Sequence, residues 1–134
     1  MNVRKQTVVA KDIIVTAKAP TPIGPYSQAV RSGDLLFCSG QVGLDPHTKE
    51  LVPGGIEAQA KQIMLNLAAV LEAAGCQFAN IIKVTIFLRN MSDFALVNKI
   101  YSSYFIDKFP ARSTVSVVGL PLGALVEIEA IARL

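Results

Sequence analysis

Two stretches with helical spacing flank one stretch that is too short and too β-branched to be an ordinary helix. Apolar side chains recur at three- and four-residue intervals over residues 56 to 74, which predicts an amphipathic helix that Gly75 ends. A second amphipathic helix is expected from Ser92, its N-terminal cap, to about Asp107. Between them, IIKVTIFLR at 81 to 89 predicts a central strand. This alternation favours helices packed on a sheet.

Five further strand patterns surround this central unit. IIVTA at 13 to 17 is a short one, and residues 28 to 41 form two more, joined by the turn residues Ser32-Gly33-Asp34, which tolerate positive φ. STVSVV at 113 to 118 and LVEIEAIA at 125 to 132 complete the set. We therefore expect an α+β fold, a mixed β-sheet with two helices packed on one face.

The size and hydropathy of the chain indicate a single domain that associates with copies of itself. The 134 residues are 51% hydrophobic, enough for one core, so we expect one domain over 13 to 134 preceded by a basic extension, 1 to 12. The mean hydropathy of +0.44 is high, yet no apolar run reaches the roughly 18 residues of a membrane span. The excess apolar surface is expected in subunit contacts.

The net charge of +3 comes from the start of the chain. Arg4, Lys5 and Lys11 stand in its first eleven residues, whereas ten Lys/Arg and ten Asp/Glu balance from Asp12 onward. The body therefore offers no basic patch that favours nucleic acid as a partner. The basic start is interpreted as a frayed tail or as the remnant of an organelle-targeting peptide, so we expect the cytoplasm, with mitochondria as the alternative.

Cysteine and histidine usage indicates no thiol or metal chemistry. Cys38 and Cys76 occur without a secretory hydrophobic segment, which fits a reducing compartment and gives no reason for a disulfide. The one histidine, His47, lies in a turn-like segment with no ligand cluster nearby. Metal sites and Cys-His or Ser-His nucleophiles are poorly supported.

The last strand pattern places a carboxylate at an expected interface. Its period of two sends Val126 to one face and both Glu127 and Glu129 to the other. If the helices cover the first face, Glu127 looks toward a neighbouring subunit, where partial desolvation suits it to acid or base catalysis. In the alternative interpretation, both glutamates are solvated or pair with Arg133 and Lys83.

Arg112 stands where the chain enters a strand, in FPARSTVSV. Its guanidinium stays charged and offers a planar fork that matches a carboxylate, although a surface arginine flanking a strand is the alternative. Tyr26 lies on a loop, 18 to 27, that three prolines stiffen, and Ser39 offers a hydroxyl beside the backbone of Gly40. Packing or turn formation is the alternative for each of these three.

Six segments, in order and at matching spacing, give the chain its resemblance to a known family. They are IGPYSQAV at 23 to 30, SGQVGLDP at 39 to 46, AAGC at 73 to 76, SDFALVN at 92 to 98, FPARS at 109 to 113 and LP with VEIEAIA between 120 and 132. With them the chain resembles the RidA (YjgF/L-PSP) family of reactive-intermediate deaminases from about residue 13 to its end.

This resemblance implies a fold, an assembly and an activity. The fold is a chorismate-mutase-like α+β subunit, and the assembly is a homotrimer with sheets inside, helices outside and a ligand cleft at each interface. The activity is cofactor-independent and metal-independent hydrolysis of enamines and imines, including 2-aminoacrylate, 2-iminopropanoate and 2-iminobutanoate. Pyridoxal-phosphate enzymes acting on serine or threonine release these intermediates, and the products are 2-oxo acids and ammonia.

The resemblance also assigns roles to residues. Arg112 is similar to the arginine that clamps the substrate carboxylate, and Glu127 to the carboxylate that orients or activates water. Asn98 matches a position that we interpret as helix support first and site second. Three further positions resemble those at which side chain or backbone lines the cleft: Tyr26, Ser39 and Gly40.

Two other functions stay open at this point. Relatives have been described as translation inhibitors with endoribonuclease activity, but one turn histidine and a charge-neutral body count against RNA cleavage. A ligand-binding or chaperone-like trimer would use the same cleft without turnover. Catalysis itself distinguishes the enzyme from such a binder, whereas RNA binding in moderate salt and cleavage lost in an Arg112 or Glu127 variant would indicate the RNA-active protein.

Overall fold

The described residues, 10–134 of the computed structural model, form six strands in one sheet and two α-helices. Along the chain, with three short 3-10 helices, the order is β1 (Asp12–Ile14), β2 (Ala29–Ser32), β3 (Leu35–Val42), α1 (Gly55–Ala73), η1 (Phe78–Asn80), β4 (Ile81–Leu88), η2 (Met91–Asp93), α2 (Phe94–Ser102), β5 (Ala111–Ser116), η3 (Pro121–Gly123) and β6 (Val126–Arg133). Residues 1–9, most of the expected basic extension, lie outside the described residues.

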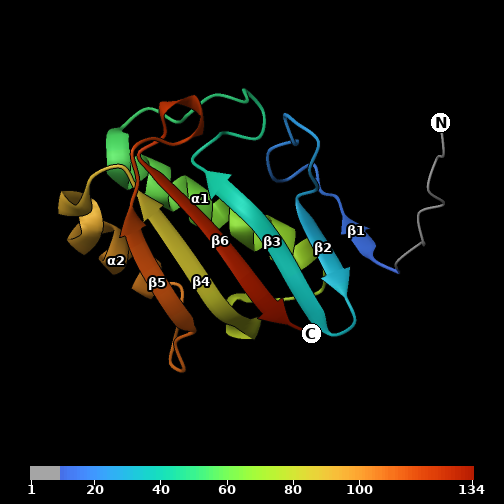
Figure 1. The fold of residues 1–134 in the computed structure, drawn as a ribbon. Helices are drawn as coiled ribbons and strands as arrows, with labels where there is room; N and C mark the ends of the chain where they lie inside the picture. The colour runs from blue at the N-terminus through green and yellow to red at the C-terminus, as the bar shows by residue number, and fades with distance from the viewer. Residues whose placement is uncertain (1–9) are drawn as a thin grey trace, which may run out of the picture.

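The sheet has the strand order β1-β2-β3-β6-β4-β5 (Figure 1). Only β4 and β5 run parallel, and every other neighbouring pair is antiparallel, so the prediction of a mixed sheet is confirmed. In the hairpin of β2 and β3, Ser32 pairs with Leu35, which leaves Gly33 and Asp34 as the turn. At the sheet edge Asp12 pairs with Arg31, so β1 begins one residue before the strand expected at 13 to 17.

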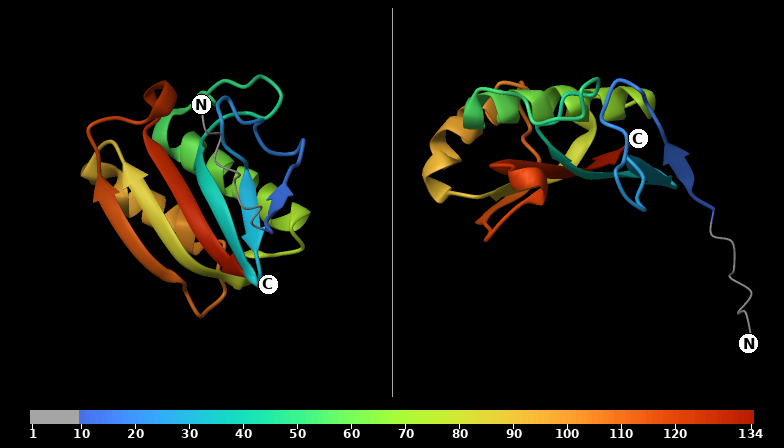
Figure 2. Two further views of the ribbon diagram at one scale, coloured as in Figure 1. Left: turned by 45° about the vertical axis from the view of Figure 1, so that its right-hand side comes forward. Right: turned by 90° about the horizontal axis from the view of Figure 1, so that it is seen from above.

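Both helices cover the same face of the sheet, as predicted (Figure 2). The alternation expected in β6 is confirmed, because Val126, Ile128 and Ala130 are buried while Glu129 is exposed on the other face. Between this face and α1 lies the hydrophobic core, whose largest fully buried side chains include Leu36, Ile63, Met64, Leu67, Leu71 and Ile86. Neither α1 nor α2 lies over the sheet face that carries the glutamates (Figure 2).

The first helix ends where the sequence predicts. Gly75 adopts φ 76°, and the N–H groups of Gly75 and Cys76 bond to the carbonyls of Glu72 and Leu71 at 2.9 and 2.8 Å. This is the Schellman arrangement that closes a helix C-terminus. No helix within residues 10–134 has the length and hydropathy to span a membrane.

The second helix is shorter than predicted. Ser92 lies in η2 rather than at the helix cap, which is Asp93, and α2 ends at Ser102 rather than near Asp107. The Ser102 and Ser103 hydroxyls donate to carbonyls of the last turn at 3.0 and 2.6 Å, which satisfies groups that a longer helix would have bonded. The chain then turns, and Phe105 packs beside Tyr101 with ring centroids 4.9 Å apart.

Candidate active site

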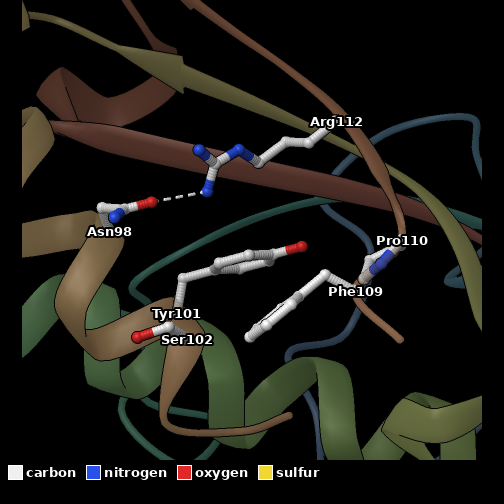
Figure 3. A pocket seen from close by; sticks show the side chains of 6 residues that line it. All are labelled: Asn98, Tyr101, Ser102, Phe109, Pro110 and Arg112. Atoms are coloured by element: carbon white, nitrogen blue, oxygen red, sulfur yellow. Dashed lines mark hydrogen bonds between the residues drawn. The ribbon is translucent and has the colours of Figure 1, made fainter. Parts of the chain in front are cut away.

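A cavity of about 400 Å³ lies between β5 and α2 (Figure 3). Its lining comprises Asn98, Tyr101, Ser102, Phe109, Pro110 and Arg112. Arg112 reaches it from β5, and Asn98 and Tyr101 reach it from α2 (Figure 3). The parallel pairing of β5 with β4 therefore places Arg112, the predicted carboxylate-binding residue, on the sheet face that packs against the helices.

The neighbours that hold the Arg112 guanidinium are uncharged. Nη1 donates to Oδ1 of Asn98 at 2.7 Å, and Cζ lies over the rings of Tyr101 and Phe94, 5.1 and 5.6 Å from their centroids. Within residues 10–134, no carboxylate pairs with Arg112, and its Nε and Nη2 donate no hydrogen bond. The positive charge and a two-donor edge of the fork are thus available to an anion.

A second cavity, of about 460 Å³, lies on the other face of the sheet. It brings together four of the predicted site residues, Tyr26, Ser39, Gly40 and Glu127, with Glu129 and Leu122 also in its wall. Of these, Glu127 projects from β6 and Ser39 and Gly40 belong to β3, which is the strand next to β6. Sequence positions about 100 residues apart therefore share one pocket.

A bulge in β3 shapes this pocket. Cys38 pairs with Ala130 and Gln41 with Ile128, which leaves Ser39 and Gly40 opposite Glu129 alone. A Cβ atom added to Gly40 would lie 2.9 Å from both Cδ and Oε1 of Glu127. Glycine at position 40 therefore makes room for the Glu127 carboxylate against the backbone of β3.

The Tyr26 loop is tied to the same bulge. Oγ of Ser39 donates to the carbonyl of Ser27 at 2.5 Å. Buried Gln28 accepts the N–H of Thr16 at 2.8 Å and donates to the carbonyl of Pro20 at 2.9 Å, so a side-chain bridge stiffens the loop in addition to its prolines. Tyr26 itself is 52% exposed, so its ring is accessible at the cavity.

Glu127 sits in surroundings that favour its protonated form. Burial raises the pKa of its carboxyl above the ordinary value, and the charge of Glu129 raises that pKa further. The ion pairs considered for the glutamates are not formed in the described residues, because Arg133 pairs with Asp34 at 3.3 Å and Lys83 donates to Ser113 at 3.2 Å. A carboxyl with a raised pKa suits proton transfer near neutral pH.

The two cavities open on opposite faces of the sheet. Arg112 pairs with Val84, which is buried beneath the helices, so Arg112 shares the helix face. Glu127 pairs with Phe87, on the face that neither α1 nor α2 covers. One copy of the chain therefore does not present Arg112 and Glu127 to the same small molecule.

Thiols and histidine stand apart from both cavities. Cys38 and Cys76 are free and buried, and burial, with a smaller effect of Cys76, raises the pKa of Cys38 to about 12. His47 is exposed in the loop after β3 and lines neither cavity. The residues from 10 to 134 contain no group of three His, Cys, Asp or Glu side chains that could hold a metal ion.

Comparison with known proteins shows the family of the chain. The family model described as Endoribonuclease L-PSP matches residues 16–134, which is nearly all of the described domain. The chain belongs to the Endoribonuclease L-PSP family.

Individual members of the L-PSP family match over almost the whole chain. The 2-iminobutanoate/2-iminopropanoate deaminase of Mus musculus is 52% identical over 92% of both chains. A protein of the conserved Rid family from Yersinia pestis, YyfA, has a structure with 49% identity and a TM-score of 0.91, covering 93% of this chain and 100% of its own. Escherichia coli TdcF, solved with bound serine, has 40% identity and a TM-score of 0.88, covering 92% and 98%.

Two aromatic residues of α2, to which the sequence analysis gave no role in the site, line the surroundings of Arg112 in this L-PSP member. Tyr101 is buried, but Phe94 is 36% exposed, and both rings contact the guanidinium of Arg112. The signal was available, because Phe94, Asn98 and Tyr101 follow one another at i, i+4 and i+7 on one side of α2. What the sequence lacks is the pairing that brings β5 beneath that side.

Gly40→Ala tests the placement of Glu127 in this L-PSP member. The new methyl group should displace the flexible end of Glu127, so we expect kcat for imine hydrolysis to fall roughly 10- to 100-fold, while the unfolding temperature changes by only about 3 °C. Steady-state kinetics and thermal unfolding measure the two effects. Gly119→Ala is the matched control, because a Cβ there meets no atom within 4 Å. Equal activity of the two variants would refute the assignment.

Proposed function

We propose that this protein hydrolyses 2-imino and 2-enamino acids, such as 2-aminoacrylate, 2-iminopropanoate and 2-iminobutanoate, to 2-oxo acids and ammonia. Relatives with about half of their residues identical, from mouse, cattle and human, are named 2-iminobutanoate/2-iminopropanoate deaminases. The observation in this chain that carries the proposal is the Arg112 guanidinium, which neutral groups hold and whose Nε and Nη2 donors are free within the described residues.

Arg112 supplies the binding step. A 2-imino acid carries a carboxylate beside its reactive carbon, and that carboxylate can accept two parallel hydrogen bonds from the Nε and Nη2 edge. Because Asn98 already occupies Nη1, the substrate is held at one defined edge of the fork. This places the imine carbon at a fixed distance from the anchor.

Glu127 supplies proton transfer. The protonated imine carbon is electrophilic, so water adds to it as the carboxylate of Glu127 takes one water proton and the C=N π electrons move to nitrogen. Glu127 then returns the proton to nitrogen, and it takes the hydroxyl proton as the C–N bond breaks and the C=O bond forms. The 2-oxo acid leaves, and the departing ammonia carries away the proton as ammonium. Its raised pKa makes the protonated carboxyl easier to form than in an ordinary glutamate, which favours the return of the proton.

The site is proposed to form between copies of the chain in a homotrimer. The placement of Arg112 and Glu127 on opposite faces supports a shared site, because a neighbour has to supply the missing half. Phe37 and Val115, 44% and 41% exposed, give the uncovered sheet face an apolar character that suits subunit contact. Light scattering should give three times the subunit mass of 14.3 kDa.

The deciding experiment supplies the unstable substrate in place. A serine or threonine dehydratase generates 2-aminoacrylate, and release of pyruvate and ammonia is followed with and without this protein. Acceleration supports the deaminase, whereas saturable binding of carboxylates without acceleration would favour a non-catalytic binding or chaperone-like trimer. Cleavage of RNA that is lost in Arg112 or Glu127 variants would favour the endoribonuclease alternative instead.

Asn98→Asp tests the neutrality of the Arg112 environment. The new carboxylate would stand where Oδ1 now lies, 2.7 Å from Nη1, and would pair with the guanidinium and repel a substrate carboxylate. We expect KM to rise roughly 30-fold or more, with a smaller change in kcat. Asn98→Ala, which removes the hydrogen bond without adding a charge, is the comparison. If Asn98→Asp and Asn98→Ala raise KM equally, the lack of charge at position 98 does not determine substrate binding.

The proposed location, the cytoplasm with mitochondria as the alternative, has its own test. Fusions of the full chain and of a chain without residues 1–12 to a fluorescent protein can be compared in cells. Identical distributions would exclude targeting by that segment.

A further inference from the structure

Two aromatic rings lie against the Arg112 guanidinium. Its Cζ lies over the rings of both Tyr101 and Phe94, within the distance at which a cation is attracted to a ring face. Within residues 10–134, the Nε and Nη2 donors of Arg112 make no hydrogen bond, so both stay open beside the rings. The rings can therefore orient the charge of Arg112 without competing with a ligand for these donors.

Tyr101 is itself held by an aromatic cluster on the helix side. Its ring centroid lies 4.9 Å from that of Phe105, and Phe105 lies 5.7 Å from Phe78. Phe78 in turn packs 5.2 Å from Tyr104. The cluster links α2 to η1 and gives the Tyr101 ring a fixed position under Arg112 (Figure 3).

The Tyr101 hydroxyl makes no hydrogen bond within the described residues that would explain a tyrosine at this position. Tyr101 is 4% exposed, and its hydroxyl is buried without a hydrogen-bond partner in the part of the chain that the structure describes. Burial raises the pKa of the phenol, an effect that the Arg112 charge opposes, so the ring stays neutral at physiological pH. A neutral ring leaves the cationic charge of Arg112 uncompensated.

We infer that Tyr101 and Phe94 are positioning residues, whose ring faces hold Arg112 in the orientation in which its Nε and Nη2 edge meets a small carboxylate. The inference rests on the proposed function only in taking that carboxylate as the ligand. Tyr101 is inferred to contribute more to the orientation of Arg112 than Phe94 does. The Tyr101 ring is buried and lies nearer to Cζ of Arg112, whereas Phe94 is partly exposed.

Calorimetric binding of serine and of 2-oxobutanoate tests the inference without requiring catalysis. Tyr101→Leu should weaken binding of both about 5- to 20-fold, and Phe94→Leu about 2- to 5-fold. Tyr101→Phe, which keeps the ring, should weaken it by about twofold. Leu36→Val is the control: it should lower the unfolding temperature and leave binding unchanged, because Leu36 is a buried core residue of β3 that belongs neither to the Arg112 cavity nor to the aromatic cluster.

Steady-state kinetics distinguish a change in binding from a loss of folded protein, because only the latter lowers the apparent kcat. In Tyr101→Leu, KM should rise by the same factor as the dissociation constant while kcat stays within about threefold, because the rings act on binding alone. Binding by Tyr101→Leu within twofold of wild type, or equal losses in Tyr101→Phe and Tyr101→Leu, would overturn the inference, as would a wild type that binds neither carboxylate. A wild type that binds them but hydrolyses no imine would overturn the proposed function only.

Discussion

Arg112→Ala should lower kcat/KM for 2-iminopropanoate roughly 100- to 1000-fold. The variant loses two charge-assisted hydrogen bonds and leaves the substrate carboxylate without a counter-charge, a loss that costs about 2–5 kcal/mol when the contact is shielded from water. The rate of pyruvate release at several substrate levels measures the effect. The assembly should stay intact by light scattering, because the rest of the cavity wall comes from α2 and the adjoining loop.

Arg112→Lys separates the contribution of the planar guanidinium to activity from that of its positive charge. An ammonium group restores the charge but loses the planar edge that offers two parallel hydrogen bonds, so we expect it to recover less than about tenfold of the lost activity. Arg31→Ala removes the same charge from an exposed position on β2 and serves as the control. Activity of Arg112→Ala close to that of Arg31→Ala would remove Arg112 from the site.

Glu127→Gln should lower kcat roughly 100- to 1000-fold with little change in KM. The amide keeps the size of the side chain but cannot take a proton from water, which is the contribution of a general base. The same assay measures it, and serine binding should stay near the wild-type value. A Gln variant with normal kcat would assign Glu127 to the cavity wall alone.

The pH profile follows from the direction of the pKa shift. The base has to be ionised, so wild-type activity should fall as pH falls through the raised pKa of Glu127, at a higher pH than an ordinary glutamate would give. Glu129→Gln removes a charge that contributes to the shift, so the acid limb should move to lower pH. Residual activity of Glu127→Gln should lack this limb. An acid limb unchanged in both variants would show that another group titrates.

Local patterns were sufficient to predict the elements and the face of each residue in β6. The alternation of LVEIEAIA places Glu127 away from the core, and Gly75 ends α1, because both features depend on neighbouring residues alone. The predicted end of α2 was wrong because it depends on contacts with residues beyond the helix. Ser103 caps carbonyls and Phe105 packs on Tyr101 from beyond the helix, and such tertiary contacts override helical spacing.

The separation of the two halves of the site could not be read from the sequence. It depends on the register in which β5 joins β4, which sets Arg112 opposite Val84 rather than its neighbour Lys83. A shift by one residue would turn Arg112 to the glutamate face. Nothing in FPARSTVSV encodes that register by itself.

The placement of Arg112 and Glu127 on opposite faces also has a genetic consequence. If each site takes Arg112 from one copy and Glu127 from the next, a subunit defective in one residue still carries the intact half that a subunit defective in the other needs. Two inactive alleles, Arg112→Ala and Glu127→Gln, would then complement each other when co-expressed. With random assembly from equal amounts, about a quarter of the interfaces would combine two intact halves.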